Sequence, residues 1–256
     1  MTTPSNDISN NVYSKKTEHA GNGLFTSEDI AAGELILEID RPFLAVLDTP
    51  RLNDACSNCF VWVPAGGTAV DGDDRENVTL RACTGCKVVK YCGKTCQSTA
   101  WTHHHKHECK IFSHLYPKIL PHTARMLLLL LLLLKAHALP PADWHAFLAL
   151  ESHLSLIRAT RPSTWETLTL ISRAAQSYSR SPEPLSLIHT LMARLLINTH
   201  TLTSPTLTPL GLYLSAPASL LNHSCAPNTT LIFHHRALSL RALHPPPRHR
   251  THNRVR

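Results

Sequence analysis

The sequence predicts an α+β protein in which two β-rich segments enclose a cysteine-rich segment and a helical region. Three observations support this prediction. Seven of the eight cysteines fall between positions 56 and 109, at spacings typical of metal ligands. Glycine turns and alternating apolar residues occur toward both ends of the chain. Apolar stripes at helical spacing run through much of the stretch 111–204.

The first β-rich segment covers residues 12–49. Apolar side chains alternate along 35–39, and Pro42 ends this predicted strand. Gly33 marks a turn before it, and Asn22-Gly23 predicts an earlier tight turn, because both residues enter left-handed backbone geometry cheaply. A glycine turn with bare backbone amides suits a charged cofactor, although an ordinary hairpin explains the same residues.

The cysteine-rich segment supplies metal ligands in pairs. Two Cys-x-x-Cys pairs precede a Cys-x-x-x-Cys pair and a histidine four residues before the last cysteine. Residues four apart share one helix face, so the two later pairs fit short helical turns. Eight ligands suffice for two tetrahedral zinc ions: Cys56, Cys59, Cys83, Cys86, Cys92, Cys96, His105 and Cys109. Core or disulfide cysteines are the alternative, which this paired spacing disfavours. The Gly- and Asp-rich stretch 65–77 predicts a solvated loop.

The region that follows predicts helices. Residues 126–134 are all apolar but far fewer than the roughly 20 that span a bilayer, so we expect a buried helix. Further helices are predicted from Pro141 to about residue 158, from a capping box at Ser163 and Glu166, and from about Pro184. Their apolar stripes, one of which includes Tyr178, are more simply core than ligand sites.

The second β-rich segment contains the stretch LLNHSCAPN and two predicted strands, 229–233 and 237–243, with a turn at His234-His235. In LLNHSCAPN a cysteine near a histidine could indicate a nucleophile. We do not expect one, because neighbouring residues on a strand or turn seldom point together.

Composition narrows the functional class. The 43% apolar content is typical of a globular protein. The net charge of +7 suggests nucleic acid, but the tail 244–256 holds four arginines and no acid, and without it the charge falls to 7 − 4 = +3. We therefore disfavour nucleic acid as a partner. The polar N-terminus lacks a secretory signal, and metal-spaced cysteines favour a reducing compartment, the nucleus or cytoplasm, with no membrane association.

The cysteine spacing resembles the MYND-type zinc finger, which also has counterparts of Tyr91-Cys92, Gln97, Trp101 and Glu108-Cys109. In MYND fingers the two zinc ions are cross-braced, and the finger docks proline-containing peptides. The resemblance implies one zinc on Cys56, Cys59, Cys92 and Cys96, and a second on Cys83, Cys86, a histidine and Cys109. Counting back from Cys109 favours His105, whereas counting forward from Trp101 favours His104; we take His105.

GNGL at 21–24 and NHSC at 222–225, on either side of such a finger, resemble the SET–MYND family of protein-lysine methyltransferases. The resemblance covers about Val12 to Leu243. It implies a SET-domain β core interrupted by a MYND finger and an α-helical insert. The implied segments are 12–49 (N-terminal SET), 56–109 (finger), 111–204 (insert), 205–243 (C-terminal SET) and 244–256 (an aberrant basic tail).

The same resemblance implies an S-adenosylmethionine site and a protein substrate with a target lysine, histones among the candidates. His153 stands where the family has an asparagine, His145 where it has a tyrosine, and Asn198 near the substrate channel. The implied cofactor residues are Ala20, Gly21, Asn22, His153, Asn222 and His223.

The stretch after Leu243 departs from the family pattern. It lacks the acidic turn, the catalytic tyrosine and the Cys-x-Cys-x-x-Cys zinc site, which leaves Cys225 without partners. We therefore expect a C-terminally truncated, incomplete SET core with poorly covered apolar surface around Leu231, Phe233 and Leu240. We also expect this chain to lack methyl transfer, with the finger as a protein-interaction module as the alternative function.

Overall fold

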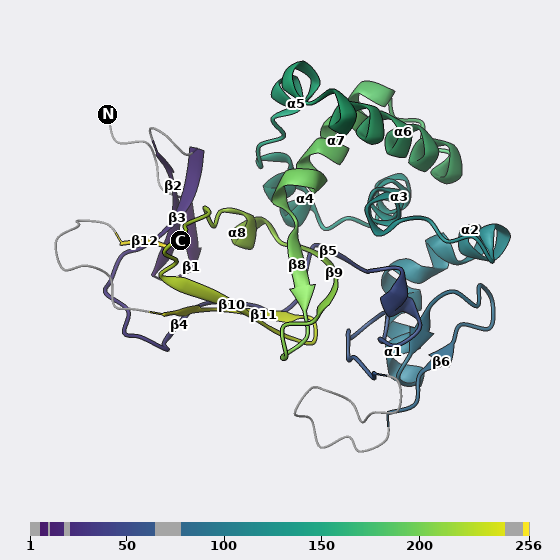
Figure 1. Cartoon of the computed structure of the whole chain (residues 1–256), viewed down its shortest axis with the longest axis horizontal. Coiled ribbons are helices and arrows are strands. Elements are labelled where there is room, and N and C mark those ends of the chain that lie inside the picture. Colours follow the sequence, from purple (N-terminus) through teal and green to yellow (C-terminus); the bar gives the residue numbers. More distant parts are fainter. Residues whose placement is uncertain (1–5, 10, 18–20, 65–77, 244–252, 256) are drawn as a thin grey trace. The chain divides into compact units, whose positions relative to one another are not determined.

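The computed structural model describes residues 6–9, 11–17, 21–64, 78–243 and 253–255 (Figure 1). The chain divides into a terminal unit, Met1–Pro42 with Ser215–Arg256, and a central unit, Phe43–Leu214. The predicted loop at 65–77 and most of the tail lie outside the described residues. Sheets and helices are both present, which confirms the α+β class.

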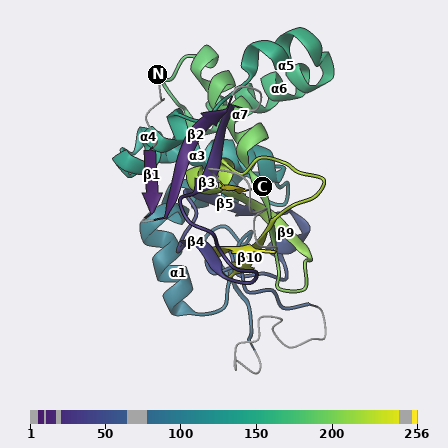
Figure 2. The same cartoon turned by 90° about the vertical axis from the view of Figure 1, so that its left-hand side faces the viewer.

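The terminal unit contains two antiparallel sheets. The first has the order β1-β2-β3-β12 and the second the order β10-β11-β4; Figure 2 shows β1, β2 and β3 side by side. The strands of the first sheet are β1 (Asn6–Ser9), β2 (Val12–Thr17), β3 (Gly21–Thr26) and β12 (Asn253–Val255). Those of the second are β4 (Leu35–Ile39), β10 (Thr229–His234) and β11 (Ala237–Ala242), and a short helix α8 (Ala216–Ser219) precedes them.

One hydrophobic core joins these two sheets. It includes Val12 and Leu24 from the first sheet, Leu37 and Leu240 from the second, and Val255 from β12. Val255 is only 3% exposed, so this part of the basic tail belongs to the folded unit.

The expectation of poorly covered apolar surface is wrong for two of its three residues. Phe233 and Leu240 are buried and Leu231 is half-buried, whereas Ile232 is exposed. Successive strand residues face opposite sides of a sheet, which explains why Ile232 and Phe233 differ.

The predicted turn at Asn22-Gly23 is also wrong, since both residues lie in β3 opposite Lys16 and Lys15. Gly21, one residue earlier, adopts the left-handed backbone with φ +61°. The turn at Gly33 (φ +83°) and the strand at 35–39 are confirmed.

The central unit combines a small sheet, the cysteine-rich segment and a helical region. Its sheet has the order β5-β9-β8, built from Leu44–Leu47, Pro209–Leu214 and His200–Thr203. The short helix η1 (Pro50–Leu52) precedes the cysteine-rich segment. The segment itself contains β6 (Arg81–Ala82), β7 (Lys90–Tyr91), α1 (Lys94–Ala100) and the π-helical turn η2 (Trp101–His105), and it ends within α2 (Lys106–Leu115). The helical region contains α3 (His122–Lys135), α4 (Pro141–Leu148), α5 (Leu154–Thr160), α6 (Pro162–Ser179) and α7 (Leu185–Asn198).

Helix α3 lies at the centre of this unit and packs against α2, α6, α7 and β5 (Figure 1). Its leucine run is buried on nearly every side, which confirms the predicted buried helix. A helix apolar all round belongs in a core.

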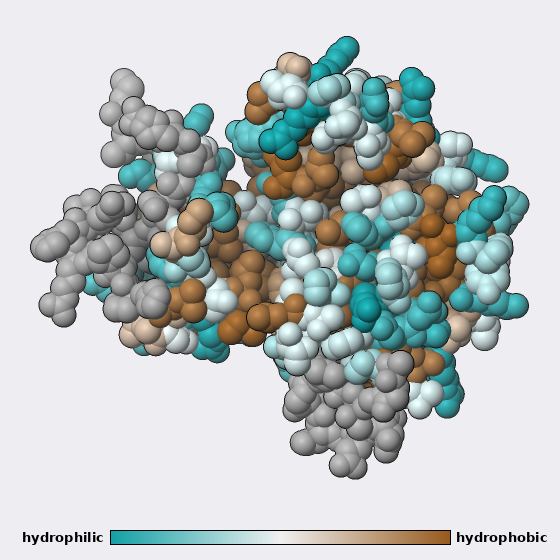
Figure 3. Space-filling model, viewed as in Figure 1, coloured by the Kyte–Doolittle hydropathy of each residue, from teal (hydrophilic) through white to brown (hydrophobic). Residues whose placement is uncertain are grey.

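None of the described helices combines the length and the apolar character that crossing a membrane requires. Figure 3 shows apolar surface interspersed with polar residues over the helical region, where Leu156 and Leu170 are exposed.

Three helical predictions need correction. The helix expected from Pro141 is two helices, α4 and α5, because the chain breaks at 149–153 and His153 takes a left-handed φ of +45°. The capping box at Ser163 is absent, since α6 begins earlier, at Pro162, without a side-chain cap. Tyr178, expected on the apolar stripe, is exposed.

Candidate functional site

The structure brings the eight predicted metal ligands together as two quartets. The first quartet is Cys56, Cys59, Cys92 and Cys96, and the second is Cys83, Cys86, His105 and Cys109. Within each quartet the potential ligand atoms lie within 4.8 Å of one another. The pairs are interleaved along the chain, which is the arrangement that the MYND resemblance implies.

The two Cys-x-x-Cys pairs share one backbone design. After each pair, the next residue, Phe60 or Lys87, has a positive φ and donates its N–H to the carbonyl of the first cysteine at 2.9 Å. Gly85 lies inside the second such turn, where an added Cβ would fall 3.0 Å from Cys109 Sγ. Each of these two turns therefore directs both of its cysteine sulfurs toward the same quartet.

The spacing of the ligand atoms fits zinc. With Zn–S of about 2.3 Å and Zn–N of about 2.0 Å, a tetrahedral site separates two sulfurs by about 3.8 Å, and a sulfur from a nitrogen by about 3.5 Å. In the first quartet Cys59 Sγ lies 3.6 Å from Cys92 Sγ. In the second, Cys83 Sγ lies 3.8 Å from Cys109 Sγ and 3.3 Å from His105 Nε2.

The electrostatics of the first quartet also call for a cation. Hydrogen bonds from Cys59, Cys92 and Cys96 lower the pKa of the Cys56 thiol, so Cys56 takes the negative charge. Hydrogen bonding to Cys56 in turn raises the pKa of Cys59 and of Cys92. Without a cation the cluster thus favours a thiolate at Cys56 and protonated thiols at Cys59 and Cys92, whereas a dication would favour their thiolate forms.

The second quartet behaves similarly. Burial raises the pKa of the Cys109 thiol to about 12. Burial also disfavours the Cys83 thiolate, but the Cys86 backbone N–H and the His105 imidazole outweigh it and lower the Cys83 pKa to about 7. Here too only part of the donor set is a thiolate unless a cation is present.

The structure selects His105 over His104 and shows why the two counts differ. His105 is 1% exposed and belongs to the quartet, whereas His104 is half-buried and outside it. Residues Trp101–His105 form a π-helical turn between α1 and α2. A π turn accommodates one residue more than an α turn, so counting forward from Trp101 falls one residue short.

In the terminal unit, the two short stretches that resemble the SET domain meet directly. The side-chain amide of Asn222 donates to the Asn22 backbone carbonyl at 3.1 Å, across 200 positions of sequence. Gly21, the residue before Asn22, has a left-handed φ of +61°. Its own carbonyl accepts a hydrogen bond from Thr17 Oγ1 at 2.9 Å. Ala20 lies outside the described residues.

His223 and Cys225 are both exposed, with Nε2 and Sγ 3.6 Å apart. The expectation that such neighbours point apart is therefore wrong for this pair. Both groups face solvent, and among the described residues no third side chain orients the imidazole, so the pair lacks the arrangement of an activated nucleophile.

The other residues assigned by resemblance lie in the central unit. His153 is exposed and holds the left-handed conformation that asparagine, the family residue here, adopts more readily. His145 is exposed on α4. Asn198 donates its amide to the carbonyls of Glu151 and Arg194, each at 2.9 Å, and so ties α7 to the loop before His153.

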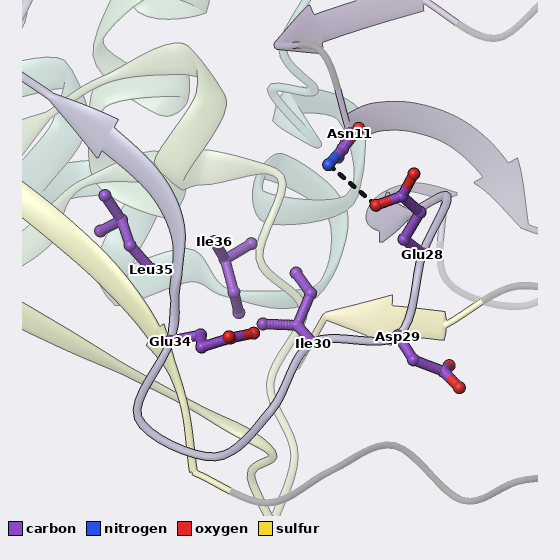
Figure 4. A pocket seen from close by; sticks show the side chains of 7 residues that line it. All are labelled: Asn11, Glu28, Asp29, Ile30, Glu34, Leu35 and Ile36. Carbon is purple, nitrogen blue, oxygen red and sulfur yellow. Dashed lines mark hydrogen bonds between the residues drawn. The ribbon is translucent and has the colours of Figure 1, made fainter.

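The terminal unit also has an open pocket of about 670 Å³, shown in Figure 4. Glu28 accepts a hydrogen bond from the Asn11 amide, and Glu34 accepts one from the Ala31 backbone N–H. The pocket is lined by Asn11, Glu28, Asp29, Ile30, Glu34, Leu35 and Ile36. These described lining residues include none of the predicted cofactor residues.

Sequence reasoning missed two buried charged residues, Glu108 beside the second quartet and Arg125 on α3. Glu108 Oε1 lies 3.2 Å from His105 Nδ1. Arg125, 3% exposed, donates through Nε to the Leu120 carbonyl at 3.0 Å and through Nη2 to the Leu47 carbonyl. Arg125 stands next to the apolar run 126–134, inside the helix predicted to be buried. A charged residue at that position indicates a buried cation, and the sequence could have revealed it.

Comparison with known proteins agrees with this geometry. A family model described as MYND finger matches residues 56–109. The Schizosaccharomyces pombe protein named "SET domain and MYND-type zinc finger protein 6" is 31% identical, over 83% of this chain and 39% of its own length. "Histone-lysine N-methyltransferase ASHR1" of Arabidopsis thaliana is 28% identical, over 87% of this chain and 44% of its own. Human "Histone-lysine N-methyltransferase SMYD3" is 28% identical, over 89% of this chain and 50% of its own length.

Among solved structures, the SET domain of LSMT bound to lysine and AdoHcy aligns with 98% of this chain and 49% of that one, at 12% identity and a TM-score of 0.43. That similarity is too low to guide residue assignments. The chain spans half or less of the length of the three relatives above. Because sequence similarity to them continues well beyond the finger on the chain, this protein belongs to the SET–MYND family.

Proposed function

We propose that this chain is part of an S-adenosylmethionine-dependent protein-lysine methyltransferase. The observation that carries the proposal is the hydrogen bond from Asn222 to the Asn22 carbonyl, which joins the GNGL and NHSC stretches. Two of the relatives are named histone-lysine N-methyltransferases, so histones are candidate substrates. Such an enzyme would act in the nucleus or cytoplasm.

The residues at this junction fit the cofactor. Gly21 offers backbone without a side chain, and an added Cβ there would meet no atom within 4 Å. The Asn222 amide has two donor hydrogens and an acceptor oxygen, so one contact to Asn22 leaves capacity for a ligand. Gly21, Asn22, Asn222 and His223 would hold the cofactor, with Ala20 added by family resemblance. Bound S-adenosylmethionine supplies a methyl group on a sulfonium.

The reaction requires a neutral amine. A free lysine has a pKa of about 10.4 and is mostly protonated at neutral pH. An apolar channel would disfavour the ammonium form, and alignment of amine, methyl and sulfur would provide much of the rate. Residues 214–256 contain no tyrosine, and Cys225 is their single cysteine. We therefore also propose that these 256 residues bind the cofactor but do not transfer methyl groups by themselves.

Calorimetric titration with S-adenosylmethionine and a radiolabelled methyl-transfer assay on histones test these claims separately. We expect binding that weakens about tenfold in Asn222→Ala, as for loss of a hydrogen bond near a charged ligand. Asn11→Ala is the matched control, because that amide bonds Glu28 elsewhere in the same unit. Absence of cofactor binding in the folded, zinc-loaded chain would overturn the site, whereas transferred label would overturn only the predicted inactivity.

The finger would hold two zinc ions, one in each quartet, and supports a second candidate function as a protein-interaction module. Trp101 is 48% exposed, and the exposed Gln97 lies four residues earlier on the same helical face. Proline-containing peptides in the polyproline II conformation dock on exposed aromatic side chains. Anisotropy of a labelled proline-rich peptide should show binding that Trp101→Ala abolishes. The control Tyr116→Ala, an exposed aromatic beyond α2, should leave it unchanged.

A further inference from the structure

We propose that Glu108 is a positioning residue for the second quartet: its carboxylate accepts the His105 Nδ1 hydrogen and so directs Nε2 to the metal. This inference rests on the proposed zinc ion of that quartet. It does not depend on methyl transfer.

The geometry defines the role of each imidazole nitrogen. Nδ1 lies 3.2 Å from Glu108 Oε1. Nε2 lies 3.3 Å from Cys83 Sγ and 3.6 Å from Cys86 Sγ. An ionised carboxylate only accepts hydrogen bonds, so the proton of a neutral imidazole belongs on Nδ1 and the free lone pair on Nε2. The three-residue spacing on one helical stretch sets Glu108 beside the ring.

Burial makes this contact more than a surface ion pair. Glu108 is 7% exposed and His105 1%. A buried carboxylate is costly unless it is paired, and a metal-bound imidazole N–H is a strong partner. Tyr91, Trp101 and Phe112 surround the ring with centroids 5.9, 6.0 and 6.4 Å away. These aromatic neighbours fix the position of the imidazole, and Glu108 is the carboxylate at its Nδ1.

Arg125 of α3 is a buried cation whose charge interacts with that of Glu108. Burial lowers the pKa of Arg125 to about 10, and the charges of Glu108 and Asp48 oppose that decrease, so the guanidinium stays charged at neutral pH. The same guanidinium bonds the Leu47 carbonyl at the end of β5. This contact ties the core helix α3 to the small sheet.

The first test replaces the carboxylate by an amide of equal size in the full chain. In Glu108→Gln we expect the second quartet to lose about 10- to 100-fold in metal affinity, the range for loss of an outer partner of a metal-bound histidine. The first quartet should be unaffected. Cadmium-113 NMR separates the two, because one site offers four sulfurs and the other three sulfurs and a nitrogen. Glu166→Gln, an exposed glutamate of α6, is the matched control.

The second test asks whether Glu108 acts through His105. In a His105→Cys background the ligand is a thiolate, which needs no tautomer, so adding Glu108→Gln should change the affinity less than twofold. If Glu108→Gln lowered the metal affinity equally in the wild-type and His105→Cys backgrounds, its role would be purely structural and the proposal would be overturned. Unchanged metal affinity of the second quartet in Glu108→Gln alone would also overturn the proposal. A wild-type chain that takes up no metal at the second quartet would instead refute the zinc assignment itself.

Discussion

Gly85 shows how tightly a single position can be constrained by a neighbouring sulfur. An added Cβ would lie 3.0 Å from Cys109 Sγ and 3.7 Å from Cys83 Sγ. We expect Gly85→Ala to displace one of these ligands and to lower the zinc affinity of the second quartet by at least tenfold, measured by competition with a chromogenic chelator. Gly93→Ala should leave it unchanged, because a Cβ there meets nothing within 4 Å.

Gly211 is constrained by backbone instead. A Cβ on this β9 residue would overlap the Val46 carbonyl oxygen and lie 2.8 Å from Leu47 Cα on β5. Neither group can move without breaking the β5–β9 pairing. We expect Gly211→Ala to reduce the free energy of unfolding by roughly 3 kcal/mol, the upper part of the usual range for overpacking, in urea denaturation. A change below about 0.5 kcal/mol would contradict the close approach.

At this scale the sequence predicts ligands better than their surroundings. The eight proposed metal ligands follow from spacing, since Cys-x-x-Cys brings two sulfurs together in almost any tight turn. The choice between His104 and His105 required the π turn of Trp101–His105, which spacing alone does not reveal. The electrostatic interaction between Glu108 and Arg125 could not be predicted from sequence, because it arises only when α2 packs against α3.

Helix α3 is the element on which the central unit depends. Leu128 is fully buried, and the helix packs against α2, α6, α7 and β5. Leu128→Ala should lower the free energy of unfolding by about 2–5 kcal/mol, the range for a leucine truncated in a core. On α6, Leu170 is 70% exposed, so Leu170→Ala should cost less than about 0.5 kcal/mol. If Leu128→Ala and Leu170→Ala lowered the free energy of unfolding by similar amounts, in thermal or urea unfolding, α3 would not be the core helix.

Element prediction succeeded where periodicity was strong and failed where packing overrides local preference. The strand at 35–39, the buried helix over the leucine run and the helix from about Pro184 all form. The break before α5 was missed, because the apolar spacing continues through it while His153 turns left-handed. Strands β5, β8 and β9 are short, and their pairing joins residues far apart in sequence, so no local pattern identifies them.

For the whole molecule, zinc should stabilise the central unit without being needed by the terminal unit. Elemental analysis should give two zinc ions per chain. On chelation, hydrogen exchange should accelerate around Val88, Val89 and Tyr91 of the finger, whereas protection at Leu24 and Leu240 of the terminal core should persist. Zinc binding displaces thiol protons, so affinity should fall as pH falls. Loss of protection in both units would contradict this independence.

The division into two units also has a consequence for synthesis on the ribosome. Val12, Leu24 and Leu37 are translated before the central unit, whereas their core partners Leu240 and Val255 are translated after it. The intervening central unit closes on itself, because Leu44 pairs with Leu214 and the Phe43 N–H bonds the Leu214 carbonyl at 2.8 Å. Once the central unit has folded, its two ends lie side by side. The long central stretch then connects the two flanking segments as closely as a short hairpin loop would. The nascent protein would thus fold its central unit first and assemble the terminal unit from the two flanking segments only afterwards.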